Sequence, residues 1–63
     1  MELIKFMKKK VSENDHNMNV SKDELNKMYK LKDDGYLLEI RSEEFPDGTY
    51  DVMFVPTEKF KEL

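Results

Sequence analysis

The chain has 63 residues, of which 40% are charged, and a formal net charge of −3. A chain of this length allows one domain, residues 1–63, and buries only about 60% of the surface that its unfolded form exposes. The absence of cysteine excludes disulfides and thiolate metal sites and fits a reducing compartment. The single histidine, His16, has no second histidine or cysteine with which to complete a metal site, so neither a metal nor a cofactor is expected.

Charge is unevenly distributed along the sequence. Residues 1–32 carry eight lysines against five acidic residues, a net of +3, whereas residues 33–63 carry nine acidic residues against three basic ones, a net of −6. No apolar run approaches the roughly 20 residues that a membrane span needs. The lysines at 8–10 follow a short apolar stretch, whereas a signal peptide has its charges before a longer one. We therefore expect a soluble, cytoplasmic protein whose charges select its partners.

The first predicted element is an amphipathic helix over residues 2–11. Its C-terminal lysines suit the negative end of the helix dipole. Residues 12–19 are almost entirely polar and are expected to form a loop. The helix prediction depends on four apolar residues that fall on one stripe at helical spacing: Leu3, Ile4, Met7 and Val11.

A second helix is predicted over residues 22–33. Ser21 and Glu24 form the S-x-x-E capping box, in which each side chain can accept a hydrogen bond from the backbone of the other residue. Gly35 follows the helical pattern and can take the left-handed conformation that commonly ends helices.

A β-hairpin is predicted next, because apolar residues alternate along residues 36–41 and again along residues 50–55. Between the two runs lies Pro46-Asp47-Gly48, in which Pro46 fits a type I turn and Gly48 fits the bulge that follows it. This turn fixes the register of the two strands, with Ile40 opposite Phe54 and Ser42 opposite Val52. A short terminal helix is predicted from about residue 57.

The predicted fold is therefore α+β: two helices, a two-stranded antiparallel hairpin and a short C-terminal helix. Two strands alone are only marginally stable in water. The second face of this hairpin carries Leu37, Met53 and Val55, which must be covered. Either the C-terminal helix covers them, or the chain forms a homodimer through this face or through a strand edge.

Between residues 33 and 51 the chain is rich in carboxylates, and Arg41 is the one basic residue among them. Because they belong to a helix end and to the hairpin, we expect folding to gather them at one end of the molecule. They form either a solvated surface or a binding site that attracts a basic partner by long-range electrostatics. The candidate partner-binding residues are Asp33, Asp34, Glu39, Glu43, Glu44, Asp47 and Asp51.

The N-terminal half offers weaker candidates. Asp15, Asn17 and Asn19 stand at the first, third and fifth positions of a segment that resembles a calcium-binding EF-hand loop. The resemblance ends there, because Val20 stands where the loop needs glycine and Asn26 where it needs glutamate. A basic cluster at the chain start forms either a phosphate-binding patch or a solvated helix face: Lys5, Lys8, Lys9 and Lys10.

In residues 21–63 the capped helix runs into "LKDDGYLLEI", then into an acidic hairpin tip, and then into "VMFVPTEKFKEL". This order resembles the end of a winged-helix domain, in which a recognition helix leads into a two-stranded wing and a closing helix. It implies that the helix at 22–33 enters a DNA groove and that residues 43–48 form the wing tip. The chain departs from that family in its few helices before the wing and in its acidic wing, since carboxylates repel phosphates.

The small, acidic, cysteine-free and lysine-rich composition is also similar to that of phage-encoded host-takeover proteins, some of which imitate DNA with arrays of carboxylates. The favoured interpretation is a non-enzymatic interaction protein, an inhibitor whose acidic hairpin binds a basic DNA-binding protein. The alternative is a winged-helix DNA-binding regulator that uses the N-terminal lysines together with Lys22, Lys27 and Lys30. Only this alternative involves nucleic acid, and neither interpretation involves a membrane.

Overall fold

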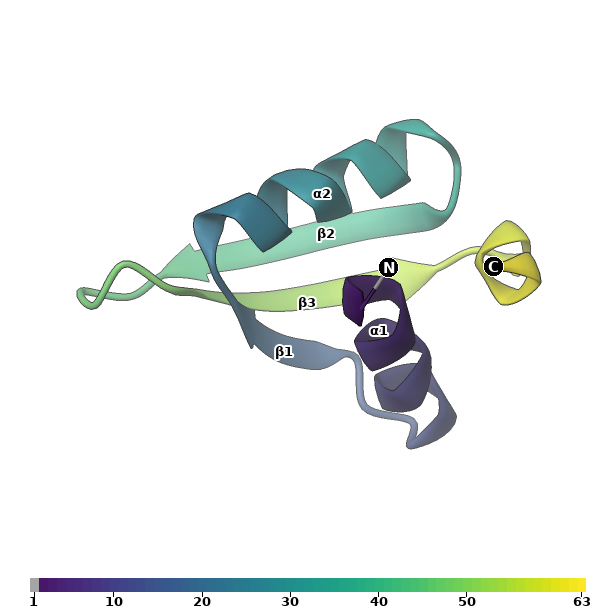
Figure 1. Ribbon diagram of the computed structural model, residues 1–63, viewed down its shortest axis with the longest axis horizontal. Helices are drawn as coiled ribbons and strands as arrows, with labels where there is room; N and C mark the ends of the chain where they lie inside the picture. The colour runs from purple at the N-terminus through teal and green to yellow at the C-terminus, as the bar shows by residue number, and fades with distance from the viewer. Residues whose placement is uncertain (1) are drawn as a thin grey trace.

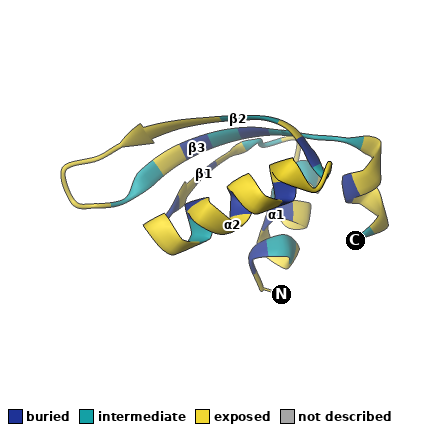
Figure 2. Cartoon of the chain, turned by 90° about the horizontal axis from the view of Figure 1, so that it is seen from above, coloured by how far each residue is buried: buried dark blue, intermediate teal, exposed yellow. Residues whose placement is uncertain are grey.

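Residues 2–63 are described by a computed structural model (Figure 1). The three strands form one antiparallel sheet in the order β1-β3-β2. Both α-helices lie on the same face of this sheet (Figure 2). The predicted α+β class is confirmed. In chain order the elements are α1 (Glu2–Ser12), β1 (Asn17–Val20), α2 (Lys22–Asp33), β2 (Leu37–Glu44), β3 (Tyr50–Pro56) and the 3₁₀ helix η1 (Glu58–Glu62).

Helix α2 has the predicted bounds, and its two ends explain why. At the N-terminus the Ser21 hydroxyl accepts a hydrogen bond from the Glu24 amide at 3.3 Å, and the Glu24 carboxylate accepts one from the Ser21 amide at 3.0 Å. At the C-terminus Gly35 has a φ of +88°, and the Tyr36 amide donates to the Leu31 carbonyl at 2.9 Å. The capping box and this left-handed closure fix where the helix begins and ends.

Helix α1 ends in the same way, one residue beyond the predicted end. Asn14 takes the left-handed conformation with a φ of 57°, and the Asp15 amide donates to the Lys10 carbonyl at 2.9 Å. Glycine is the residue most often found in this left-handed position at a helix end, and asparagine is the next most common. The helix buries Leu3 and Met7, which belong to the predicted apolar stripe.

Strands β2 and β3 form the predicted hairpin in the predicted register. Ile40 lies opposite Phe54, and Ser42 lies opposite Val52. At the turn the Gly48 amide donates to the Phe45 carbonyl at 3.0 Å, and Gly48 has a φ of +87°. Gly48 thus supplies the left-handed residue that follows a type I turn in a hairpin.

The sheet has three strands, so the prediction that the hairpin forms a two-stranded sheet by itself is wrong. The additional strand, β1, begins within residues 12–19, which we expect from the sequence to be a loop, and ends at Val20. It pairs with β3, placing Met18 opposite Val52 and Val20 opposite Tyr50. Met18 and Val20 are buried, whereas Asn17 and Asn19 are exposed. Asparagine is unfavourable in strands, but pairing with an already formed neighbouring strand overrides that preference.

A β-bulge near the start of β2 changes which side chains reach the core. Leu37 lies opposite Pro56 and Glu39 lies opposite Val55, so Leu38 is the extra residue in the strand. As a result Leu37 is buried, with 3% of its surface exposed, and Leu38 is 69% exposed. The expectation that Leu37 lies on the second hairpin face, where it would serve a homodimer, is therefore wrong.

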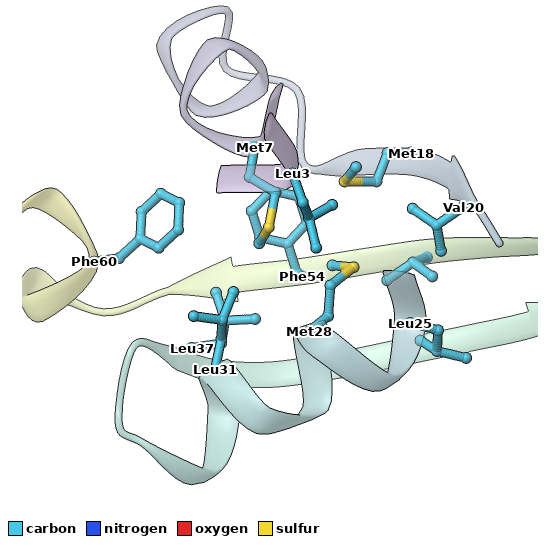
Figure 3. Close-up of a cluster of buried hydrophobic side chains, with 11 residues drawn as sticks. Leu3, Met7, Met18, Val20, Leu25, Met28, Leu31, Leu37, Phe54 and Phe60 are labelled. Atoms are coloured by element: carbon cyan, nitrogen blue, oxygen red, sulfur yellow. The ribbon is translucent and has the colours of Figure 1, made fainter. Parts of the chain in front are cut away.

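The core lies between the helices and the covered face of the sheet (Figure 3). The chain continues from β3 into η1, whose Phe60 is 2% exposed and closes one end of this core. The predicted terminal helix is thus a single 3₁₀ segment, and its apolar residue joins the core. The eleven buried residues are Leu3, Met7, Met18, Val20, Leu25, Met28, Leu31, Leu37, Val52, Phe54 and Phe60.

Candidate binding surface

The face of the sheet opposite the helices carries no other element of residues 2–63 (Figure 2). The strand register arranges its side chains in rows that cross all three strands. One row consists of Asn19, Asp51 and Glu43. The next consists of Asn17, Met53 and Arg41. This open face is therefore mixed: two apolar side chains of β3, Met53 and Val55, lie among polar and charged ones.

Two carboxylates face each other directly across the strands on this face. Glu43 on β2 and Asp51 on β3 are paired residues, and both are exposed. Like charges in directly opposed positions destabilise a sheet. Arg41 is the nearest cation along the strand, but its Nε donates to the Glu39 carboxylate at 2.9 Å. The opposed carboxylates line a shallow hollow of about 270 Å³ together with Arg41, Ser42 and Met53.

The charges of the hairpin are poorly compensated. Within residues 2–63 the ion pairs join Lys10 to Asp15, Arg41 to Glu39 and Lys61 to Glu58. None of them involves the four carboxylates at the far end of the hairpin, which we call the acidic hairpin end: Glu43, Glu44, Asp47 and Asp51. An external cation can therefore approach these carboxylates without displacing a lysine or arginine of the same chain.

Asp47 differs from the other three, because it also holds the turn together. Its carboxylate accepts hydrogen bonds from the Thr49 amide at 2.9 Å and from the Thr49 hydroxyl at 2.6 Å. These bonds hold the pKa of Asp47 below the ordinary value for an aspartate. The Asn19 amide group also donates to the Thr49 hydroxyl, at 3.0 Å, which ties β1 to the turn.

The structure does not gather all seven predicted site residues at one end. Asp33 and Asp34 lie at the C-terminal end of α2, just before β2 begins, whereas the acidic hairpin end lies at the other end of β2 (Figure 1). An eight-residue strand spans roughly 25 Å. Glu39 lies near the start of β2 and is engaged by Arg41. The sequence could not reveal this division, because it depends on the length and direction of β2.

The N-terminal candidates are placed by other contacts. Asp15 accepts a hydrogen bond from the Asn17 amide and forms an ion pair with Lys10, both at 3.1 Å, and these two bonds lower the pKa of its carboxyl. The segment that resembles a calcium loop is divided between strand β1 and the first turns of helix α2. No group of three metal-ligating side chains is found within residues 2–63.

Comparison with known proteins gives no match to a protein family, to a curated protein or to a solved structure. None of the helices within residues 2–63 is long and apolar enough to cross a membrane.

Proposed function

We propose that this protein is a non-enzymatic interaction module, an inhibitor that binds a basic DNA-binding protein in the cytoplasm through the acidic hairpin end. The observation that supports the proposal is the opposition of Glu43 and Asp51, a pair of like charges of the kind that destabilises a sheet, neither of which forms an ion pair within residues 2–63. Local rules of folding are most often broken at functional sites. A lysine or arginine of a partner would remove the repulsion upon binding.

The acidic hairpin end has the properties needed to occupy a surface that normally binds phosphates. Its four carboxylates are all exposed, and they lie at the end of the sheet where β2 turns into β3 (Figure 1). Complementary charge accelerates the encounter with a basic partner and favours it over acidic competitors. The proposed interaction must weaken as salt rises, since the Debye length is only about 8 Å at physiological ionic strength.

Charge reversal tests this proposal. The test variant carries Glu43→Lys, Glu44→Lys and Asp51→Lys, and leaves Asp47 in place because that residue holds the turn. The control variant carries Glu13→Lys, Asp33→Lys and Glu62→Lys, which change the net charge equally at exposed positions outside the hairpin. We expect wild type and control to retain a basic DNA-binding protein from nuclease-treated bacterial lysate, and to release it to competing duplex DNA.

The test variant should lose that protein while its circular dichroism spectrum stays unchanged. Equal retention by all three proteins would contradict the proposal, because binding would then not depend on the acidic hairpin end. Release that is insensitive to salt would contradict it as well, since the attraction between exposed charges is screened.

A second candidate function is that of a winged-helix DNA-binding regulator. The observation in its favour is that α2 leads directly into the hairpin and exposes Lys22, Lys27 and Lys30. This function requires affinity for duplex DNA that falls steeply with salt concentration. Changing these three lysines to glutamate should then abolish DNA binding, whereas the hairpin variant should bind DNA more tightly, because it removes carboxylates from the wing.

A further inference from the structure

A small apolar groove lies between the first and the last elements of the fold. Val11 on α1 and Phe60 on η1 are its apolar lining, and Ser12 lies beside them. Lys8 and Lys61 also line the groove, and both are exposed. The Lys8 ammonium donates a hydrogen bond to the Leu63 carbonyl, which joins the two sides of the groove. The Lys61 ammonium also lies 3.4 Å from the Glu58 carboxylate. The groove therefore combines an apolar interior with a lysine on each rim.

The size of the groove suits one aromatic side chain. Its volume is about 220 Å³. Pockets for drug-sized ligands are usually larger, at about 300–1,000 Å³, whereas an apolar cavity of about 150 Å³ accommodates benzene. The lysines on the rims favour an aromatic ring whose neighbours are acidic. The expected occupant is thus a phenyl ring on an acidic segment.

The chain itself carries such a ring at the tip of its hairpin. Phe45 is 38% exposed and follows Glu43 and Glu44 in the sequence. The other exposed aromatic side chains have basic neighbours. The Lys10 ammonium lies 5.6 Å from the centre of the Phe6 ring, and Lys30 follows Tyr29. Charge complementarity with the rims of the groove therefore singles out Phe45.

The hairpin tip and the groove lie towards opposite ends of the molecule, whose longest dimension is 34 Å (Figure 1). A chain cannot fill its own groove with its own Phe45. We propose that Phe45 of one copy inserts into the groove of a second copy, with Glu43 and Glu44 facing Lys8 and Lys61. Such a contact joins two different surfaces, so it generates either a ring or an open row of copies.

This inference goes beyond the proposed function, because it assigns a ligand to a second surface. Both interactions use the acidic hairpin end, so a basic partner and a second copy would compete for it. In the self-associated state the hairpin tip would be covered by the second copy, and a basic partner would have to displace that copy in order to bind. A variant changed only in the groove separates the two ideas, since it keeps the hairpin that the partner would bind.

Sedimentation velocity over a range of concentrations tests the inference at low salt. The wild type should show an average mass that rises above that of the monomer as its concentration increases. Two variants should each sediment as a monomer: Phe45→Ser, which lacks the ring, and Lys8→Glu with Lys61→Glu, which reverses the rims. Loss of a central aromatic anchor should weaken association by at least about 30-fold.

Mixing the two variants gives the sharpest result. The groove variant retains an intact hairpin tip, and Phe45→Ser retains an intact groove, so an equimolar mixture has one complete interface. We expect the mixture to form dimers and nothing larger. The control variants Phe6→Ala and Leu38→Ser change exposed apolar residues outside both surfaces and should associate like the wild type. All variants should retain the circular dichroism spectrum of the wild type.

Three outcomes overturn the inference. A wild type that remains monomeric at every concentration leaves the groove to an occupant other than a second copy. A mixture that remains monomeric shows that the tip and the groove do not bind each other. Loss of association in Leu38→Ser but not in Phe45→Ser assigns the contact to the sheet instead. None of these outcomes bears on binding of a basic partner by the hairpin.

Discussion

At the scale of single residues, the acidic hairpin end contains two kinds of carboxylate. Asp47 is held by two hydrogen bonds from Thr49 and contributes to the turn. Glu43 and Asp51 lie directly opposite each other and reduce the stability of the sheet. Residues of one chemical type thus have opposite effects on folding, and only those that oppose it need an explanation outside the fold.

The hydrogen bonds to Asp47 predict a pH dependence of stability. Its pKa is lowered in the folded chain, so its contribution is fully present above the unfolded pKa of about 3.9 and is lost as the pH falls through the folded pKa. Asp47→Asn should therefore lower the melting temperature near neutral pH. The difference from wild type should shrink below about pH 4. A difference that stays constant from pH 7 to pH 2 would contradict this account.

A second prediction at the residue scale concerns the two phenylalanines Phe54 and Phe6. Phe54 is fully buried at the centre of the core, whereas Phe6 is 49% exposed. Truncating a buried phenylalanine to alanine typically costs about 3–5 kcal/mol. Phe54→Ala should therefore unfold at much lower urea concentration than wild type or fail to fold, and Phe6→Ala should change the unfolding midpoint only slightly. Equal urea midpoints for the two variants would contradict the assignment of Phe54 to the core and of Phe6 to the surface.

At the scale of elements, the two strands of the hairpin are buried to different degrees along their length. Close to the helices, β2 and β3 are held by buried Val52 and Phe54. Towards the tip, residues 41–48 are all exposed. The distal part of the hairpin therefore contributes little to the core, which leaves its side chains free to contact a partner.

The opposition of Glu43 and Asp51 predicts a gain of stability on charge reversal. Glu43→Lys turns a repulsive cross-strand pair into an attractive one and should raise the free energy of unfolding by about 0.2–1 kcal/mol. Glu44→Lys is the matched control, because Glu44 lies opposite the uncharged Tyr50. Urea unfolding at low salt measures both effects. A variant that gains stability but loses its basic partner would show that the repulsion is retained for binding.

At the scale of the whole molecule, the elements are held to unequal degrees. Strand β3 pairs with a neighbour on each side and supplies two core residues, Val52 and Phe54. Helix α1 is not part of the sheet, and its buried residues are Leu3 and Met7. Elements with fewer buried contacts open at lower free energy than the rest of a protein.

Native-state hydrogen exchange should therefore protect the amides of β3 most strongly and those of α1 least among the regular elements. The comparison is made at low denaturant, where local opening is separated from global unfolding. Equal protection of α1 and β3 would show that the chain opens only as a whole. Early exchange of α1 would also mean that the groove between α1 and η1 exists only while that helix is docked.

The sequence determined the parts of this protein that depend on local interactions. The capping box at Ser21 set the start of α2, and the Pro46-Asp47-Gly48 turn set the register of the hairpin. Such signals act over a few residues, so they can be recognised without knowledge of the rest of the chain. The same register places Glu43 opposite Asp51.

Tertiary structure alone decided the remaining features, because each depends on contacts between distant parts of the chain. Strand β1 exists because β3 pairs with it, although alternation of buried Met18 and Val20 was a faint local signal. The bulge turns Leu37 inward only because the core lies on that side. The length of β2 separates Asp33 and Asp34 from the hairpin tip, and the groove forms only where the two ends of the chain meet. The conformational preferences of neighbouring residues do not predict such contacts between distant parts of the chain.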